Sequence, residues 1–260
     1  MTEKQLSDGQ PGRSIETAAD HTTSLNDDSA VFADVRVYRT ELFVFLEEEE
    51  SLESVTLLDP NGQEYGTGSP ALGEWSVRFQ LLPPDRHSTD EPYESGTYTA
   101  IALDGDGNEL DELEFDLEPD LSVVGFEAWR TSGPLVVLEN TGSGPVLVIG
   151  IEITDGFPDS IDGTGLEGLS TASRQPDVPI MPGEIVTIQL DDSIQFSTEE
   201  DAVDVCGDSF EGTFEITTAR DDPVIDTLEV DFSDDLYHDE LLIEYGCEYV
   251  SGGEVMAFDR

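Results

Sequence analysis

The sequence predicts an all-β protein that folds into two tandem β-sandwiches, and three observations lead to this prediction. Short runs rich in Val, Ile, Leu and Phe recur along the chain, polar clusters with Gly, Pro, Asn or Asp separate them, and helical periodicity is nearly absent. The runs form two blocks on either side of Glu118-Pro119-Asp120, and 260 residues suffice for two domains that each bury a core. We therefore expect a polar tail or docking arm over residues 1–30, one sandwich over 31–118 and another over 119–260.

The first block begins with strand-like residues at 31–38 and 42–46. A Gly-containing turn between two apolar runs, which is typical of β-hairpins, occurs twice, in SVTLLDPNGQEYG and in SGTYTAIALDGDGNELDELEFDLEP. Apolar and polar residues alternate in EWSVRFQL, so one face of the expected strand carries the apolar side chains: Trp75, Val77, Phe79 and Leu81.

The second block contains the most informative stretch of the chain, GPLVVLENTGSGPVLVIGIEI at residues 133–153. Two β-branched apolar runs flank a turn cluster in which Asn and Gly tolerate positive φ and Pro145 removes a backbone donor. This pattern predicts a strand, a tight turn and a second strand that together form a hairpin. Later strands are expected in VPIMPGEIVTIQL, GTFEITTA, VIDTLEVDF and ELLIEYGCEYV, with one short helical turn within residues 195–205.

The chain carries 60 acidic and 10 basic residues, a formal net charge of −50. This charge would strain a compact fold in dilute buffer, where the Debye length is about 10 Å, but molar salt shortens that length to about 3 Å and screens the repulsion. We therefore expect a protein adapted to very high salt. Calcium-loaded adhesive domains are an alternative, and disorder fits only the first thirty residues, because the later strands are periodic. The scarcity of cations disfavours nucleic acid as a partner.

One acidic stretch is a candidate cation site. Asp104, Asp106, Asn108 and Asp111 offer oxygen ligands at nearly alternate positions, as a calcium loop does. The glycine and the glutamate that complete an EF-hand loop are missing, and a plain Asp-Gly hairpin turn accounts for the same residues. Both interpretations stay open, and Ca²⁺ or another cation is the only cofactor that the sequence suggests.

The chain has two cysteines, Cys206 and Cys247, and each adjoins a predicted strand. A disulfide between them would close a loop of about 40 residues and stabilise the second domain by about 4 kcal/mol in the chain-entropy model. Two buried thiols are the alternative. Without a C-x-x-C pair, a zinc site is disfavoured.

Catalytic, export and anchoring signals are not evident in the sequence. There is no G-x-S-x-G elbow, HExxH helix or glycine-rich phosphate loop, and no carboxylate pair stands out as a hydrolase site. The N-terminal residues lack the apolar core of a signal peptide, and no apolar run approaches the roughly 20 residues needed to span a bilayer. Every Asn fails the N-x-S/T pattern for glycosylation. We therefore expect a protein that is not an enzyme and has no membrane span.

A family resemblance rests on ENTGSGPVLVIGIEI, which IMPGEIVTIQL follows about thirty residues later. The pair resembles the N-x-G and Pro-Gly-Glu pattern of immunoglobulin-like modules related to the cell-adhesion-related bacterial domain, which many haloarchaeal surface proteins contain. The resemblance implies that Asn140 and Gly142 lie in a first hairpin and that Pro182-Gly183-Glu184 forms the turn before the next core strand. It also implies two tandem immunoglobulin-like β-sandwiches and an exposed, adhesive or architectural role.

Two functional hypotheses follow. The first is a structural component of a high-salt extracellular assembly, most specifically a haloarchaeal virion protein such as a capsid decoration, turret or tail protein, made in the cytoplasm and released by lysis. Its partners would be proteins, including further copies of the same chain, and its N-terminal segment would dock on a neighbour. The second is a cell-surface adhesin or solute-binding module that holds its ligand, or Ca²⁺, in the sandwich loops.

Overall fold

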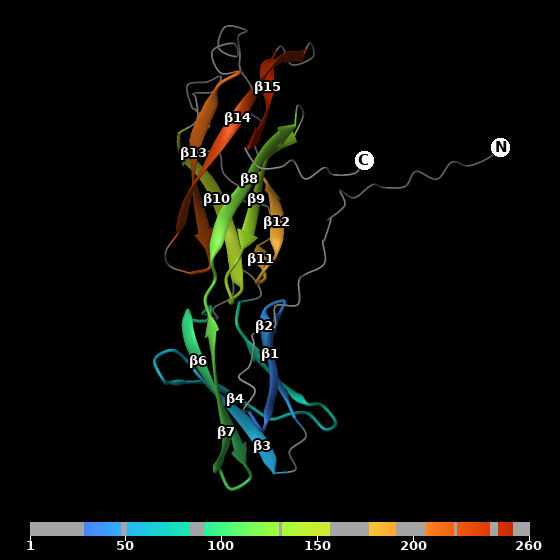
Figure 1. The fold of residues 1–260 in the computed structure, drawn as a ribbon, viewed down its shortest axis with the longest axis vertical. Helices are drawn as coiled ribbons and strands as arrows, with labels where there is room; N and C mark the ends of the chain where they lie inside the picture. Colours follow the sequence, from blue (N-terminus) through green and yellow to red (C-terminus); the bar gives the residue numbers. More distant parts are fainter. Residues whose placement is uncertain are drawn as a thin grey trace, which may run out of the picture.

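The computed structural model describes residues 29–47, 51–83, 91–129, 132–156, 177–190, 206–220, 223–239 and 244–251. Within these ranges the chain is all β, which confirms the predicted class, and no helix long and apolar enough to cross a membrane is found there. The strands form two units stacked along the long axis of the molecule, and the chain runs directly from the last strand of the lower unit into the upper one (Figure 1). Residues 1–28 of the predicted tail, and the predicted helical turn, lie outside the described residues.

Two antiparallel sheets make up the first unit. The smaller sheet has the strand order β1-β2-β5, with β1 at Phe32–Tyr38, β2 at Glu41–Leu46 and β5 at Ser76–Gln80. The larger sheet has the order β4-β3-β6-β7, with β4 at Glu64–Gly68, β3 at Leu52–Leu58, β6 at Gly96–Asp104 and β7 at Glu109–Leu117. Both predicted hairpins, β3 with β4 and β6 with β7, are confirmed by their antiparallel pairing.

One hydrophobic core lies between these two sheets. Alternate residues of each strand point into it, as Leu113, Phe115 and Leu117 of β7 do while Glu114 and Asp116 stay exposed. Burial of such side chains contributes roughly 1.5–3 kcal/mol each. Of the apolar residues predicted to share one face, Val77, Phe79 and Leu81 are buried, whereas Trp75 precedes β5 and is 47% exposed.

A single hydrogen-bonded sheet forms the second unit, in the order β11-β10-β13-β14-β15-β8-β9-β12. Its strands are β8 (Leu121–Trp129), β9 (Ser132–Asn140), β10 (Val146–Asp155), β11 (Val178–Ile180), β12 (Ile185–Gln189), β13 (Ser209–Thr218), β14 (Val224–Asp239) and β15 (Glu244–Ser251).

This long sheet folds over its own core, so that β8-β9-β12 faces β11-β10-β13-β14. Side chains from both groups of strands meet in one cluster, among them Phe126 and Phe214, with ring centroids 5.4 Å apart. Across the two layers, the Val123 amide donates to Asp226 Oδ2 at 2.6 Å, beside an irregularity in β8. The second unit is therefore compatible with a β-sandwich whose layers β15 links on one side.

The predicted hairpin at residues 133–153 is wrong. Its two strands exist, as β9 and β10, but β9 pairs with β8 and β12, whereas β10 pairs with β11 and β13. The turn between them carries the chain from one layer of the unit to the other. β9 and β10 bury one face each against the core of the second unit, from opposite sides. β10 is apolar on its other face as well, because Leu147 and Ile149 pack against the core of the first unit.

The two units repeat one strand order. Numbered within each unit, the first unit reads 1-2-5 facing 4-3-6-7, and the second reads 1-2-5 facing 4-3-6-7 with β15 added between strands 7 and 1. The two core clusters divide between Leu117 and Leu121, and the predicted boundary Glu118-Pro119-Asp120 lies between these residues.

The seam between the units is buried and specific. The Tyr93 hydroxyl, from the first unit, donates to the Pro145 carbonyl at 2.8 Å, and the Arg220 guanidinium lies 5.3 Å from the centre of the Tyr93 ring. Burial raises the pKa of Tyr93, so the hydroxyl keeps the proton that it donates. Leu147, on β10, packs into the core of the first unit, while its neighbours Val146 and Val148 face the core of the second.

Two glycines allow this close approach. The backbone amides of Ser143 and Gly144 donate to the Glu118 carbonyl at 2.8 and 3.1 Å. A Cβ on Gly142 would overlap that carbonyl, and a Cβ on Gly144 would overlap the Tyr93 hydroxyl. A side chain at either position would therefore push the two units apart.

We predict that Gly144→Ala lowers the free energy of unfolding by about 1–3 kcal/mol, because the methyl group has no space beside the Tyr93 hydroxyl. Gly105→Ala is the matched control, since a Cβ there meets nothing within 4 Å. Denaturant unfolding of both variants in molar salt measures the difference. Equal stabilities for the two variants would show that the seam tolerates a side chain and is not tightly packed.

Candidate interaction surface

The proposed cation residues form a hydrogen-bonded hairpin turn. Asp104 Oδ1 accepts from the backbone amides of Asp106 and Asn108 at 2.9 and 2.8 Å, and Asp104 Oδ2 accepts from the Asn108 side chain at 2.9 Å. These hydrogen bonds, that from the Asn108 side chain first, lower the pKa of Asp104. Gly107 supplies the positive φ, 81°, that closes the turn. The Asp104 carboxylate is thus engaged by its own loop.

Asp111 does not join that turn but holds the start of the first unit. Its Oδ2 accepts from the Ser29 hydroxyl at 2.8 Å and from the amides of Ala30 and Val31 at 2.9 Å each. Among the described residues, no group of three or more His, Cys, Asp or Glu side chains is placed to hold a metal ion. The calcium hypothesis for these residues therefore stays a prediction, and the structure gives Asp104 and Asp111 structural roles.

Cys206 is disulfide-bonded, and the chain has one other cysteine, Cys247. Cys206 packs against the core of the second unit just before β13, while Cys247 belongs to β15. The predicted bond between these positions would tie the added strand β15 to the sandwich and close a loop of about 40 residues, which stabilises by about 4 kcal/mol in the chain-entropy model; the Cys247 side chain lies outside the described residues.

The residues that carried the family resemblance lie together around Asn140, which is fully buried. Its side-chain oxygen accepts from the amides of Asp120 and Gly142, both at 3.1 Å, and its side-chain nitrogen donates to the carbonyls of Gly144 and Ile180 at 2.9 and 3.2 Å. Its backbone amide donates to the Glu184 carbonyl and its carbonyl accepts from the Gly183 amide. Asn140 therefore joins the N-x-G segment to the Pro-Gly-Glu turn, as a structural hub.

A group of side chains that the sequence analysis did not single out covers the outer face of the three-stranded sheet. We call this group the arginine–aromatic face, and it consists of Arg36, Tyr38, Arg39, Phe43, Phe45 and Arg78. Five of these residues belong to β1, β2 and β5 and alternate with the core residues Val35, Leu42, Val44 and Val77, so they point away from the core. The sixth, Arg39, lies in the turn between β1 and β2.

Strand register places these side chains in contact. Arg36, Phe43 and Arg78 form one row across β1, β2 and β5. The Arg78 guanidinium lies 5.7 Å from the Phe43 ring centre, and Arg36 lies 5.6 Å from that of Phe45. The Phe43 and Phe45 rings stack at 6.2 Å, and Tyr38 meets Phe43 edge to face at 6.3 Å. Cation–π contacts of this kind contribute about 0.5–1 kcal/mol each at exposed sites.

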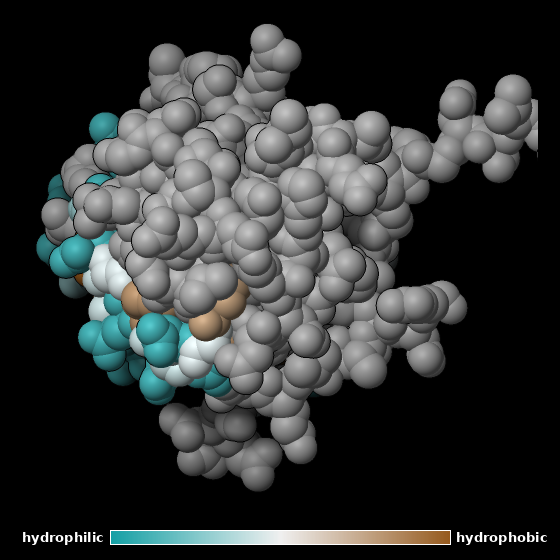
Figure 2. Space-filling model, turned by 90° about the horizontal axis from the view of Figure 1, so that it is seen from above, coloured by the Kyte–Doolittle hydropathy of each residue, from teal (hydrophilic) through white to brown (hydrophobic). Residues whose placement is uncertain are grey.

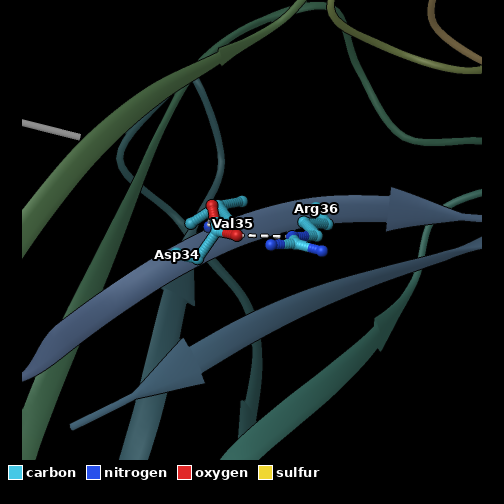
Figure 3. A network of polar contacts seen from close by, with 3 residues as sticks. All are labelled: Asp34, Val35 and Arg36. Carbon is cyan, nitrogen blue, oxygen red and sulfur yellow. Dashed lines mark hydrogen bonds and ion pairs between the residues drawn. The ribbon is translucent and has the colours of Figure 1, made fainter. Parts of the chain in front are cut away.

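Acidic residues pair with two of these arginines. Asp34 accepts from Arg36 Nε, and both side chains come from β1 (Figure 3). Asp34 Oδ1 also accepts from the Val35 amide at 2.8 Å, which fixes the carboxylate in place. Arg78 lies 3.5 Å from Glu74 Oε2. The face remains open, since Tyr38 is 59% exposed and the Arg78 side chain 52% exposed.

Sequence reasoning missed this face because its residues have the ordinary alternation of a strand. A signal was nevertheless present in the sequence, because Arg is scarce. Arg36, Arg39 and Arg78 are three of the four arginines within the described residues, and they belong to segments that also contain Tyr38, Phe43 and Phe45. Arg and aromatic residues are enriched at protein interfaces, and on this face Tyr38 is exposed while Phe43 and Phe45 are half-buried.

A shallow hollow lies at the seam, lined by Asp116, Glu118, Pro119, Asp120, Gly142 and Ser143. Two of its carboxylates are already engaged, since Asp116 accepts from the Thr97 hydroxyl at 2.7 Å and Asp120 from the Thr141 hydroxyl at 2.8 Å. The hollow therefore belongs to the joint between the units, and the arginine–aromatic face is the better candidate for binding.

For Asp111 we predict a pH-dependent role in stability. Burial alone would raise the pKa of Asp111, but hydrogen bonds from Val31, Ser29, Glu112 and Ala30 outweigh it and lower the pKa. A lowered pKa stabilises the fold above the unfolded value of about 3.9, and this contribution is lost as the pH falls through the folded value. Asp111→Asn should cost about 1 kcal/mol at neutral pH and progressively less below about pH 4.

The matched control for this prediction is Asp106→Asn, because the exposed Asp106 side chain accepts no hydrogen bond from the described residues. Unfolding curves of both variants and the parent chain between pH 3 and 7 give the comparison, the range being set by roughly the ordinary carboxyl pKa. Equal costs at all pH values would contradict the anchoring role. Stabilisation by Ca²⁺ at constant ionic strength, lost in Asp111→Asn, would instead support the calcium loop.

Comparison with known proteins gives no assignment. No protein-family model matches the chain, and a search of the curated proteins finds no significant match.

Proposed function

We propose that this chain is a non-enzymatic structural protein, in which two tandem immunoglobulin-like sandwiches form one rigid building block of a high-salt extracellular assembly. Its most specific form is a haloarchaeal virion component, such as a capsid decoration, turret or tail protein. The observation that carries the proposal is the buried seam, in which Tyr93, Pro145 and Leu147 hold two sandwich-like units together. A rigid joint of this kind suits a structural subunit that holds neighbouring proteins of an assembly at fixed positions.

The strand order supports the immunoglobulin-like assignment. In immunoglobulin constant-type domains, strands 1, 2, 5 and 4 form one sheet and strands 3, 6 and 7 form the other. Both units here keep 1-2-5 and 3-6-7 together, and strand 4 pairs with strand 3 instead of strand 5. A move of one edge strand between the layers leaves the core pairing unchanged.

A tyrosine of the first unit gives further support. Immunoglobulin-like domains have a tyrosine near the start of the sixth strand, whose hydroxyl donates to the backbone a few residues upstream. Tyr98 is the third residue of β6, the sixth strand, and its hydroxyl donates to the Glu94 carbonyl at 3.0 Å. Burial raises the pKa of Tyr98, so this donor stays protonated.

The acidic surface supports the proposal that the protein is adapted to high salt. The chain has a formal net charge of −50, and β7 exposes Glu112, Glu114 and Asp116 in a row along its outer face. Viewed along the long axis from the end of the second unit, the visible described residues are mostly hydrophilic, with a small hydrophobic area among them (Figure 2). At molar salt the repulsion within such a surface is largely screened.

The virion proposal predicts where the protein is found after release from its host. Density-gradient fractionation of a producing culture in molar salt, followed by mass spectrometry, should place this chain in particles that also contain a nucleic acid genome. A soluble host enzyme of known location serves as the control for cell lysis. Recovery with the cell envelope would favour the adhesin hypothesis and contradict the virion assignment, and recovery as free protein would contradict both.

A further inference from the structure

The arginine–aromatic face is electrically neutral in a strongly acidic chain. Three cations, Arg36, Arg39 and Arg78, lie on it, and three carboxylates accompany them: Asp34 and Glu74, which pair with Arg36 and Arg78, and Glu41, which is outward on β2. The whole chain, by contrast, has a net charge of −50. Another acidic protein can therefore approach this face with less repulsion than the acidic row on β7 would cause.

The face is also complementary to itself. It carries cations, carboxylates and aromatic rings within one short patch, so a two-fold axis suitably placed in the patch can bring the cations of one copy to the carboxylates and rings of the other. Such isologous contacts are the commonest way in which identical chains associate. Arg and aromatic residues are the types enriched at the centres of protein interfaces.

The backbone at Arg39 is a second, independent observation. Arg39 is the non-glycine residue with positive φ among the described residues, at 57°, in the two-residue turn between β1 and β2. Glycine is favoured at the first position of a hairpin turn with this φ, and an L-residue there costs roughly 1–2 kcal/mol. The Arg39 guanidinium lies 5.4 Å from the centre of the exposed Tyr38 ring. Residues that keep an unfavourable backbone conformation, as the exposed Arg39 does, occur preferentially at functional sites.

We propose that a second copy of this chain binds the arginine–aromatic face through its own arginine–aromatic face, forming a two-fold dimer. The inference rests on the proposed structural function and names both the partner and the surface. Arg78 and Tyr38 lie at the contact, where Arg78 exchanges or shares its carboxylate partner with the other copy and the aromatic rings pack against each other.

Sedimentation equilibrium of the full chain in molar salt tests this proposal. The parent chain should form dimers, and Arg78→Glu should raise the dissociation constant about 100-fold, because it replaces a cation by a carboxylate on both faces at once. Tyr38→Ser should weaken association as well. Ile225→Ser is the matched control, since Ile225 is an exposed strand residue of the second unit, 57% exposed against 59% for Tyr38.

Charge reversal at both partners of the Arg78–Glu74 ion pair gives a second test of the proposed dimer contact. Glu74→Arg gives the face an excess of cations, so a mixture of the Arg78→Glu and Glu74→Arg chains should dimerise more tightly than either variant alone. Far-ultraviolet circular dichroism and melting temperatures establish that each variant is folded. A parent chain that stays monomeric, or an Arg78→Glu chain that dimerises as well as the parent, would overturn the proposal.

The test of the dimer surface can fail without the proposed function failing, and the reverse is also true. If the chain occurs in virions but Arg78→Glu leaves self-association unchanged, the structural function stands and this surface is wrong. If the chain dimerises through the arginine–aromatic face but never occurs in particles, the surface stands and the virion assignment fails.

Discussion

The structure depends on one buried amide, that of Asn140. A buried amide is costly unless each donor and acceptor has a partner, and Asn140 satisfies two side-chain acceptor positions, two side-chain donors and both backbone groups. Aspartate has a similar shape but cannot donate to the carbonyls of Gly144 and Ile180, and it would bury a charge. Leucine could fill the space but would remove the hydrogen-bond partner that the Asn140 side chain supplies to four backbone groups. Only asparagine meets both requirements at this position.

The consequences of this amide extend to the seam. By holding Gly142 and Gly144, Asn140 fixes the loop that carries Pro145 and the start of β10. That loop receives the Tyr93 hydroxyl and presents Leu147 to the core of the first unit. The link between the units thus depends on a hydrogen-bonded hub in the second unit, to which the short connection contributes the Glu118 carbonyl and the Asp120 amide.

Much of the fold could be predicted from local patterns, because strands with one buried face alternate visibly, as residues 113–117 do, and because Pro60-Asn61-Gly62 and the Asp104 turn close their hairpins locally. Strand pairing was harder. Residues 133–153 have the sequence of a hairpin, yet β9 and β10 belong to opposite layers, because which strands pair depends on contacts distant in the sequence. The residues of a turn determine where the chain reverses its direction, but they do not determine which strands pair with each other.

The candidate site was less accessible to sequence reasoning. Acidic loops drew attention to Asp104 and Asp111, but in a chain so rich in Asp most such residues serve turns and backbone amides. The arginine–aromatic face brings together residues from three strands, and only the register of β1, β2 and β5 shows that Arg36, Phe43 and Arg78 form one row. Scarcity of arginine was a usable signal, because three of the four arginines in the described part of the chain lie on this face.

The central claim is that the two sandwich-like units move as one rigid body. Backbone ¹⁵N relaxation of the full chain in molar salt tests it most directly, because rigidly joined units tumble together and flexibly joined units do not. The account predicts one rotational correlation time for the strands of the first unit and those of the second. Two distinct and shorter correlation times, one for each unit, would contradict it.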